Sequence, residues 1–163
     1  GDDVDRTIAL HVADRTLARD GWDLTNDAVT FDRLVYASEV AKCELAESEV
    51  AAIAIPSVDA AAPESCGIIP ISRDEVQQLT LDLVRSTFVI CDEVLAQAGL
   101  KARDMQAVFL AGGSTRLPGL VGYIESYFGK RPRSDLDPMQ VVGIGASLAA
   151  ARPAVSELLD PCA

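Results

Sequence analysis

The order of predicted elements favours an α/β core that carries an inserted, smaller α+β lobe. Three observations predict it. First, two amphipathic helical segments precede two short runs of β-branched residues. Second, a long helical segment with a wide apolar face follows them. Third, an apolar run leads into a glycine-rich turn and further helical segments. We therefore expect a small α+β lobe over residues 1–79, an α/β core lobe over residues 80–151, and a tail or linker over residues 152–163.

The first two helices are predicted over Val4–Arg19 and Ala28–Ala46. Ile8, Val12 and Leu17 mark an apolar face on the first, and Asp20-Gly21 gives it a glycine stop. Thr25, Asn26 and Asp27 are candidate N-caps for the second. Its apolar stripe repeats every three or four residues: Phe31, Leu34, Ala37, Ala41 and Leu45.

Two short segments, "EVAAIAIPSVD" and "CGIIPIS", predict neighbouring antiparallel strands, with Pro56 and Pro70 at edges or strand ends. "SRDE" at Ser72–Glu75 then matches a capping box. It predicts one long helix from about Arg73 to Ala98, stopped by Gly99, and its wide apolar face is expected to link the two lobes.

The apolar run Val108–Ala111 is typical of a strand buried on both faces. Pro118 occupies a helix-start position, and "KRPRSD" predicts a short edge strand or loop. A last helix carries Gly143 and Gly145, which we expect to permit close packing.

Composition excludes several classes of function. The formal net charge of −11 argues against a general nucleic-acid binder and against an anionic membrane surface. No apolar run reaches the length of a membrane span, and the start "GDDVDRTIAL" lacks the features of a signal peptide. The four cysteines form no CxxC, and the single histidine, His11, lies near none of them, so we expect no metal site and a reducing, cytoplasmic compartment.

The stretch "VFLAGGSTRLPGL" has two readings. Ligands of α/β proteins collect at the carboxyl ends of strands, glycine admits a ligand to the main chain, and Arg116 could stack on a flat ring or grip an anion. Those features predict a nucleotide or phosphate site. A plain strand-to-helix turn is the alternative, since the stretch is neither a Walker A motif nor GxGxxG.

The longer stretch through "DPMQVVGIGASLAA" closely resembles the end of the nucleotide-binding domain of the heat shock protein 70 (HSP70) chaperones. That family reads hydrophobic-hydrophobic-GGSTRIP, followed by a helix, a proline-containing segment and a Gly-Ala-rich helix. "GDDVDRTI" is similar to the family's GGxDFD segment, "SEVAKCELAES" to C-E-x-A-K-x-x-L-S, and "ISRDEVQQL" to I-T-R-x-x-F-E-x-L. The resemblance covers residues 1 to about 151 in order, and implies an actin-like ATPase (ribonuclease H-like) half-domain, the second lobe of the ATPase domain.

The resemblance also implies an adenosine site made from two walls. The glycine loop would lie against the nucleoside, with Ser114 at the base or ribose and Arg116 stacked by the adenine. A helix of the smaller lobe would bond the ribose hydroxyls, and a three-residue spacing puts its two side chains on one face. The implied cofactor-binding residues are Gly112, Gly113, Ser114, Arg116, Glu39 and Lys42. A solvated Glu–Lys pair is the alternative reading of the last two.

Three positions depart from the family pattern. Cys43 stands where the family has an arginine that sandwiches the adenine, Ala46 where it has a serine that bonds the purine edge, and Met139 where it has an acidic residue. Losing one stacking cation weakens binding by about 0.5–2 kcal/mol. These departures put adenosine affinity and base selectivity in question.

The implied partners are ATP or ADP, a nucleotide exchange factor on the small lobe and a J-domain co-chaperone, with Mg²⁺ in the complete domain. No catalytic or metal-ligating residue is assigned, because the family's phosphate hairpins, magnesium-coordinating aspartates and catalytic lysine have no counterpart here, so this segment alone is not expected to hydrolyse ATP. Two alternatives stay open: an interaction module of the same fold that has lost nucleotide binding, and another actin-like ATPase such as a sugar kinase or filament protein.

Overall fold

A computed structural model describes residues 1–57, 65–133 and 135–151. It is a mixed α/β structure with a two-stranded sheet. In chain order the elements are α1 (Asp2–Asp20), α2 (Ala28–Glu44), β1 (Val50–Pro56), β2 (Ser65–Ser72), α3 (Arg73–Leu79), α4 (Leu81–Gln97), the 3₁₀ turns η1 (Ala102–Asp104) and η2 (Gly113–Arg116), α5 (Leu120–Phe128) and α6 (Val141–Ala151).

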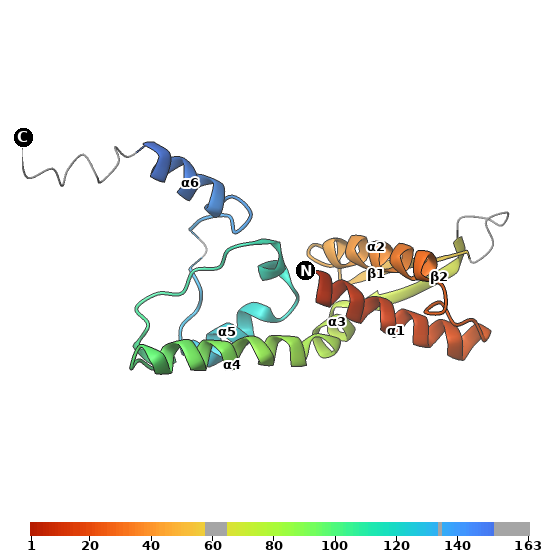
Figure 1. Ribbon diagram of the computed structural model, residues 1–163, viewed down its shortest axis with the longest axis horizontal. Helices are drawn as coiled ribbons and strands as arrows, with labels where there is room; N and C mark the ends of the chain where they lie inside the picture. Colours follow the sequence, from red (N-terminus) through yellow and green to blue (C-terminus); the bar gives the residue numbers. More distant parts are fainter. Residues whose placement is uncertain (58–64, 134, 152–163) are drawn as a thin grey trace, which may run out of the picture.

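The N-terminal part, residues 1–79, contains most of the buried apolar side chains. In Figure 1, α1 and α2 run side by side over the hairpin of β1 and β2. The strands pair antiparallel with Ile53 opposite Ile69, as the sequence predicted. Alternation puts Ile53 and Ile55 on the helix-covered face and leaves Ala52 and Ala54 exposed, which is the usual pattern of a one-sided antiparallel sheet.

The helical stripes of this part are largely as expected. Ile8 and Val12 of α1, and Leu34 of α2, are fully buried. Leu17 is an exception, because its side chain points to solvent with 45% exposure. Asp27 is the N-cap of α2, accepting a hydrogen bond from the Thr30 backbone N–H at 2.7 Å.

The single helix predicted over residues 73–98 is wrong, because the chain forms two helices that meet at Thr80. The predicted capping box is present at the start of α3: Ser72 Oγ accepts from the Glu75 backbone N–H, and Glu75 accepts from the Ser72 backbone N–H. Thr80 is buried, and its hydroxyl donates to the Val76 carbonyl at 2.7 Å. The backbone of Thr80 has φ −96° and ψ −1°, away from ideal α-helical values, and this local departure separates the two helices, which apolar periodicity does not reveal.

The C-terminal part, residues 80–151, is more open. In Figure 1, α4 extends away from the N-terminal part with α5 along it, and α6 stands apart. The prediction of a doubly buried strand at Val108–Ala111 is wrong here: the run makes one parallel bridge, from Phe109 to Arg133, and Phe109 is 58% exposed. A central strand is paired on both edges, and among the described residues only Arg133 pairs with this run.

The last helix also differs from expectation. No residue of α6 is buried, and open space surrounds both Gly143 and Gly145. Close packing at these glycines is therefore wrong for the described structure. Pro118 precedes α5 by two residues, and Gly119 in the left-handed conformation serves as its N-cap.

Candidate functional site

One cavity of about 370 Å³ lies where the two parts of the chain meet, between α2 and η2. Its volume is within the range of small-molecule sites, roughly 300–1,000 Å³. More of its surface is apolar than polar. It is lined by Gly1, Val4, Glu39, Lys42, Cys43, Ala46, Gly113, Ser114, Arg116, Leu117 and Met139.

Helix α2 supplies one wall of this cavity. Glu39, Lys42 and Cys43 follow one another at helical spacing, so they present a single face to the cavity, and Ala46 extends this wall in the turn just after the helix ends. Leu34 and Ala41 lie on the buried side of α2 and hold it against α1 and the sheet. The polar wall is thus positioned by the apolar stripe behind it.

Lys42 does not extend freely into the cavity. Its ammonium lies 2.8 Å from Asp5 Oδ2 and 2.7 Å from Asp5 Oδ1, and the carboxylate belongs to α1. The contact with Oδ2 has hydrogen-bond geometry, whereas the contact with Oδ1 is a close ion-pair contact without it. Asp5 is only 4% exposed, so this pair joins α1 to α2 at the edge of the cavity.

The glycine loop supplies the facing wall. Gly112 has φ 92° and ψ 158°, a conformation open almost only to glycine, and its N–H donates to the Pro138 carbonyl at 2.8 Å. Gly113 lines the cavity, and a Cβ built on it would lie 3.2 Å from the sulfur of Met139. The backbone is therefore bare where the loop faces the cavity.

Arg116 is held by Asp137. Its Nη2 donates to Asp137 Oδ1 at 3.0 Å, and the same oxygen accepts the Met139 backbone N–H at 3.0 Å. The hydrogen bond from the Met139 backbone N–H is the largest cause that holds the pKa of Asp137 below its usual value; burial opposes it, and the hydrogen bond and charge of Arg116 add to the lowering. Asp137 thus fixes both the arginine and the methionine that line the cavity.

The structure brings five of the six predicted site residues to this cavity; Gly112 adjoins it without lining it. Ser114 Oγ accepts a hydrogen bond from the Gly1 nitrogen at 3.0 Å, so the glycine loop also contacts the residue that precedes α1. Cys43, Ala46 and Met139, the three departures from the family pattern, also lie in the lining.

Sequence reasoning missed the two carboxylates that hold the cations of this site. Asp5 had one detectable signal: it falls on the same helical stripe as Ala9, Val12 and Thr16, so it is an acidic residue on a buried face. Asp137 gave no such signal, because its partner Arg116 lies far along the chain. Val4 and Leu117, two apolar residues that also line the cavity, were not predicted either, because the cavity forms only when segments far apart in the sequence come together.

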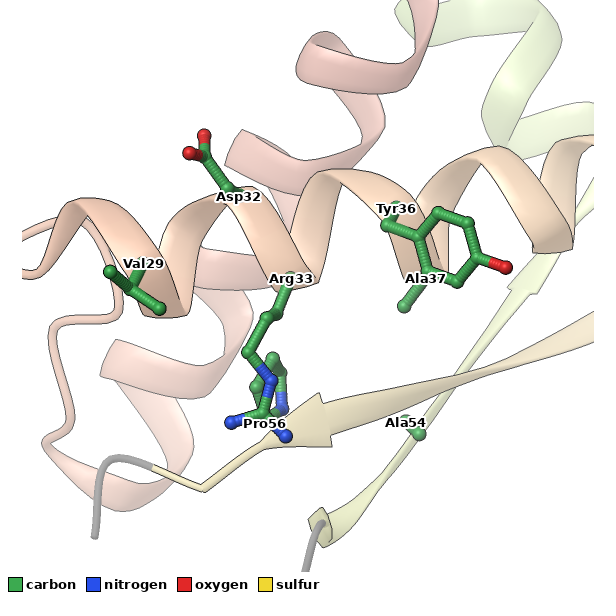
Figure 2. A pocket seen from close by; sticks show the side chains of 7 residues that line it. All are labelled: Val29, Asp32, Arg33, Tyr36, Ala37, Ala54 and Pro56. Carbon is green, nitrogen blue, oxygen red and sulfur yellow. The ribbon is translucent and has the colours of Figure 1, made fainter. Parts of the chain in front are cut away.

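A second hollow, of about 570 Å³, lies on the outer side of the N-terminal part between α2 and β1. Figure 2 shows Arg33 extending from α2 toward Pro56, while Asp32 points to the opposite side of the helix. Val29 and Tyr36 on its rim are each 68% exposed. This hollow belongs to one part of the chain and contains no predicted site residue, so we favour the cavity between α2 and η2 as the ligand site.

The described segments hold no group of three His, Cys, Asp or Glu side chains that could bind a metal ion. Cys43 and Cys91 are free thiols. Within the part of the chain that the structure describes, no helix combines the length and the apolar character needed to cross a bilayer.

The protein has a mixed α/β structure. Helix α2 from one part and the glycine loop from the other form the walls of a small, largely apolar cavity, which is the candidate ligand site. The family model "Hsp70 protein" matches residues 1–157. The chain therefore belongs to the HSP70 family, whose members are nucleotide-binding chaperones that take ATP or ADP with Mg²⁺.

Proposed function

We propose that this chain supplies the adenosine-binding side of the ATP/ADP cleft in an HSP70-like chaperone, as the second lobe of its ATPase domain. Residues 1–79 are the smaller lobe and residues 80–151 the core lobe. The complete protein would use ATP binding and hydrolysis to drive protein folding. The observation that carries this proposal is that Lys42, Arg116 and the bare backbone of Gly113 line the same cavity.

The proposed roles follow from the chemistry of each wall. Glu39 and Lys42 bond the ribose hydroxyls, since a carboxylate accepts and an ammonium donates hydrogen bonds. Gly113 and Ser114 lie against the nucleoside, and the planar guanidinium of Arg116 stacks on the adenine. Gly112 turns the chain so that this loop faces α2. When bound, Mg²⁺ would neutralise charge on the phosphates. In this proposal the residues described here contact the nucleoside and not the phosphates.

Partners follow from the same assignment. An exchange factor would act on the smaller lobe, and a J-domain co-chaperone would act on the complete protein. The exposed rim of Val29 and Tyr36 beside the hollow of Figure 2 supports a protein contact on the smaller lobe, because solvent-facing aromatic and aliphatic side chains favour protein interfaces.

Calorimetric titration of the full-length protein with ADP tests the site. Replacing Arg116 with alanine removes the stacking cation, and the dissociation constant for ADP is expected to rise roughly 2- to 30-fold. Arg85→Ala is the matched control, because Arg85 is an exposed arginine on α4 that pairs with Asp82 outside the cavity. Equal ADP affinity in wild type and Arg116→Ala contradicts the assignment.

A second candidate is an interaction module of the same fold without nucleotide binding. It is favoured by one observation: Cys43, Ala46 and Met139, the positions that depart from the family, all lie in the cavity wall. The same titration separates the two candidates, since no heat of binding at millimolar ADP in the full-length wild type supports the module.

A further inference from the structure

Asp5 is a charged side chain in an apolar setting. It lies in the first turns of α1, next to Val4 and Ile8, and its side chain is 5% exposed. A buried carboxylate is strongly unfavourable unless an opposite charge and hydrogen bonds compensate for the lost hydration. The compensating partner among the described residues is Lys42.

The partner of Asp5 is one of the cavity-lining residues. Lys42 stands near the end of α2, its side chain is 18% exposed, and its ammonium touches both carboxylate oxygens. An ammonium has three N–H donors. The hydrogen bond to Asp5 Oδ2 uses one of them, so two remain for groups in the cavity.

We propose that Asp5 is a positioning residue that holds the Lys42 ammonium at the cavity edge, ready to donate to the two ribose hydroxyls of a bound nucleotide. This inference rests on the proposed function. A free lysine samples many rotamers and loses that freedom when a ligand binds. A lysine already held by Asp5 loses less, and its charge stays where the ligand hydroxyls would lie.

A purely structural role for Asp5 makes a different prediction. If the ion pair only joined α1 to α2, its loss would weaken the binding of every nucleotide to a similar extent. If Asp5 acts through Lys42, its loss would weaken the binding of nucleotides with ribose hydroxyls in particular. The ratio of affinities for ADP and 2′,3′-dideoxy-ADP separates the two roles.

The test is calorimetric titration of both nucleotides into the full-length protein. Wild type is expected to prefer ADP by about tenfold, the equivalent of one or two hydrogen bonds to a charged group. Asp5→Asn keeps the shape of the side chain and removes its charge. We expect it to cut this preference to about threefold or less while changing dideoxy-ADP affinity by less than about twofold.

Thr16→Val is the matched control. Thr16 is fully buried on the same helix, and its hydroxyl donates only within α1, to the Val12 carbonyl at 2.9 Å. Loosening α1 there is expected to leave the preference for ADP at the wild-type value. If Asp5→Asn fails to fold, as judged by circular dichroism, Asp5→Glu serves instead: it keeps the charge but displaces the carboxylate by one methylene, which moves the Lys42 ammonium, so the preference for ADP is expected to fall here too.

The outcomes are distinct. A preserved tenfold preference in a folded Asp5 variant overturns the positioning role and leaves the proposed function standing. A wild type that binds ADP without preferring it over dideoxy-ADP also overturns the positioning role. A wild type that binds neither nucleotide overturns the proposed function itself.

Discussion

Gly112 and Gly113 are adjacent, yet the structure requires glycine at each for a different reason. Gly112 has a backbone conformation that residues with a Cβ rarely adopt, with open space around its Cα. Gly113 has an ordinary φ, and its space is limited by Met139 on one side and the cavity on the other. Gly112 is therefore needed for the fold of the loop, and in the proposed function Gly113 leaves room for the nucleoside.

Substituting each glycine with alanine separates these reasons. Gly112→Ala is expected to lower the free energy of unfolding by about 1–3 kcal/mol, because it forces strain on the backbone. Gly113→Ala is expected to change stability much less, since the neighbouring methionine is flexible, and to weaken ADP binding several-fold because a methyl group enters the nucleoside contact. Urea unfolding and ADP titration of the full-length variants measure both effects.

The opposite pattern would contradict this explanation. If Gly113→Ala destabilised the protein as much as Gly112→Ala and left ADP affinity unchanged, the contact with Met139 would be a matter of packing alone.

At the scale of elements, the pair α4 and α5 is joined by one aromatic residue. Tyr127 of α5 stacks on Phe88 of α4 with ring centroids 4.5 Å apart, and its hydroxyl donates to Asp92 Oδ1 at 2.5 Å. The hydrogen bond to the Asp92 carboxylate, followed by burial, raises the pKa of Tyr127 to about 12. A raised phenol pKa means that the neutral form is the one stabilised in the folded protein.

This pair predicts a pH dependence with a definite sign. The stabilisation from Tyr127 is complete below its ordinary pKa of about 10 and is lost as the pH rises through about 12. An ultraviolet titration of residues 1–163 should show a phenolate transition near pH 12 that disappears in Tyr127→Phe. In Asp92→Asn the same transition should move toward lower pH. A wild-type titration without a transition near pH 12 would refute the hydrogen bond.

Over the whole molecule, burial is unevenly distributed. The apolar core cluster consists of residues of the N-terminal part, whereas Val84 and Ile124 are the buried apolar residues that the structure describes in the C-terminal part. Side chains on α4 such as Val89, Ile90 and Val94 are 57–60% exposed. Apolar surface of this kind stabilises a fold only when something covers it.

Hydrogen exchange measured on residues 1–163 should reproduce this division. The amides of Ile53 and Ile69 lie at paired positions of the two strands, their side chains are buried, and they are expected to exchange slowly. Amides of Phe109 and Leu110, in a segment with a single bridge, are expected to exchange at least tenfold faster. Equal protection of the two segments would show that the C-terminal part is covered in solution.

The sequence predicted most of the candidate site residues that line the cavity, but it did not predict the carboxylates that hold Lys42 and Arg116 in place. Glu39 and Lys42 were placed on one helix face by spacing alone, and the glycine loop was identified by its composition and its resemblance to the family. The carboxylates behind them were not found, because Asp5 and Asp137 act through partners that only the folded chain brings within 3 Å or so.

By itself, the sequence determined what depends on neighbours a few residues apart: the capping box at Ser72, the antiparallel hairpin, and a glycine turn after Ala111. Only the tertiary structure decided that Thr80 interrupts the long helix, that Val108–Ala111 stays half-exposed, and that Lys42 is held by Asp5. The physical reason is range. Capping and alternation are local, whereas burial and ion pairing depend on which distant segments come together.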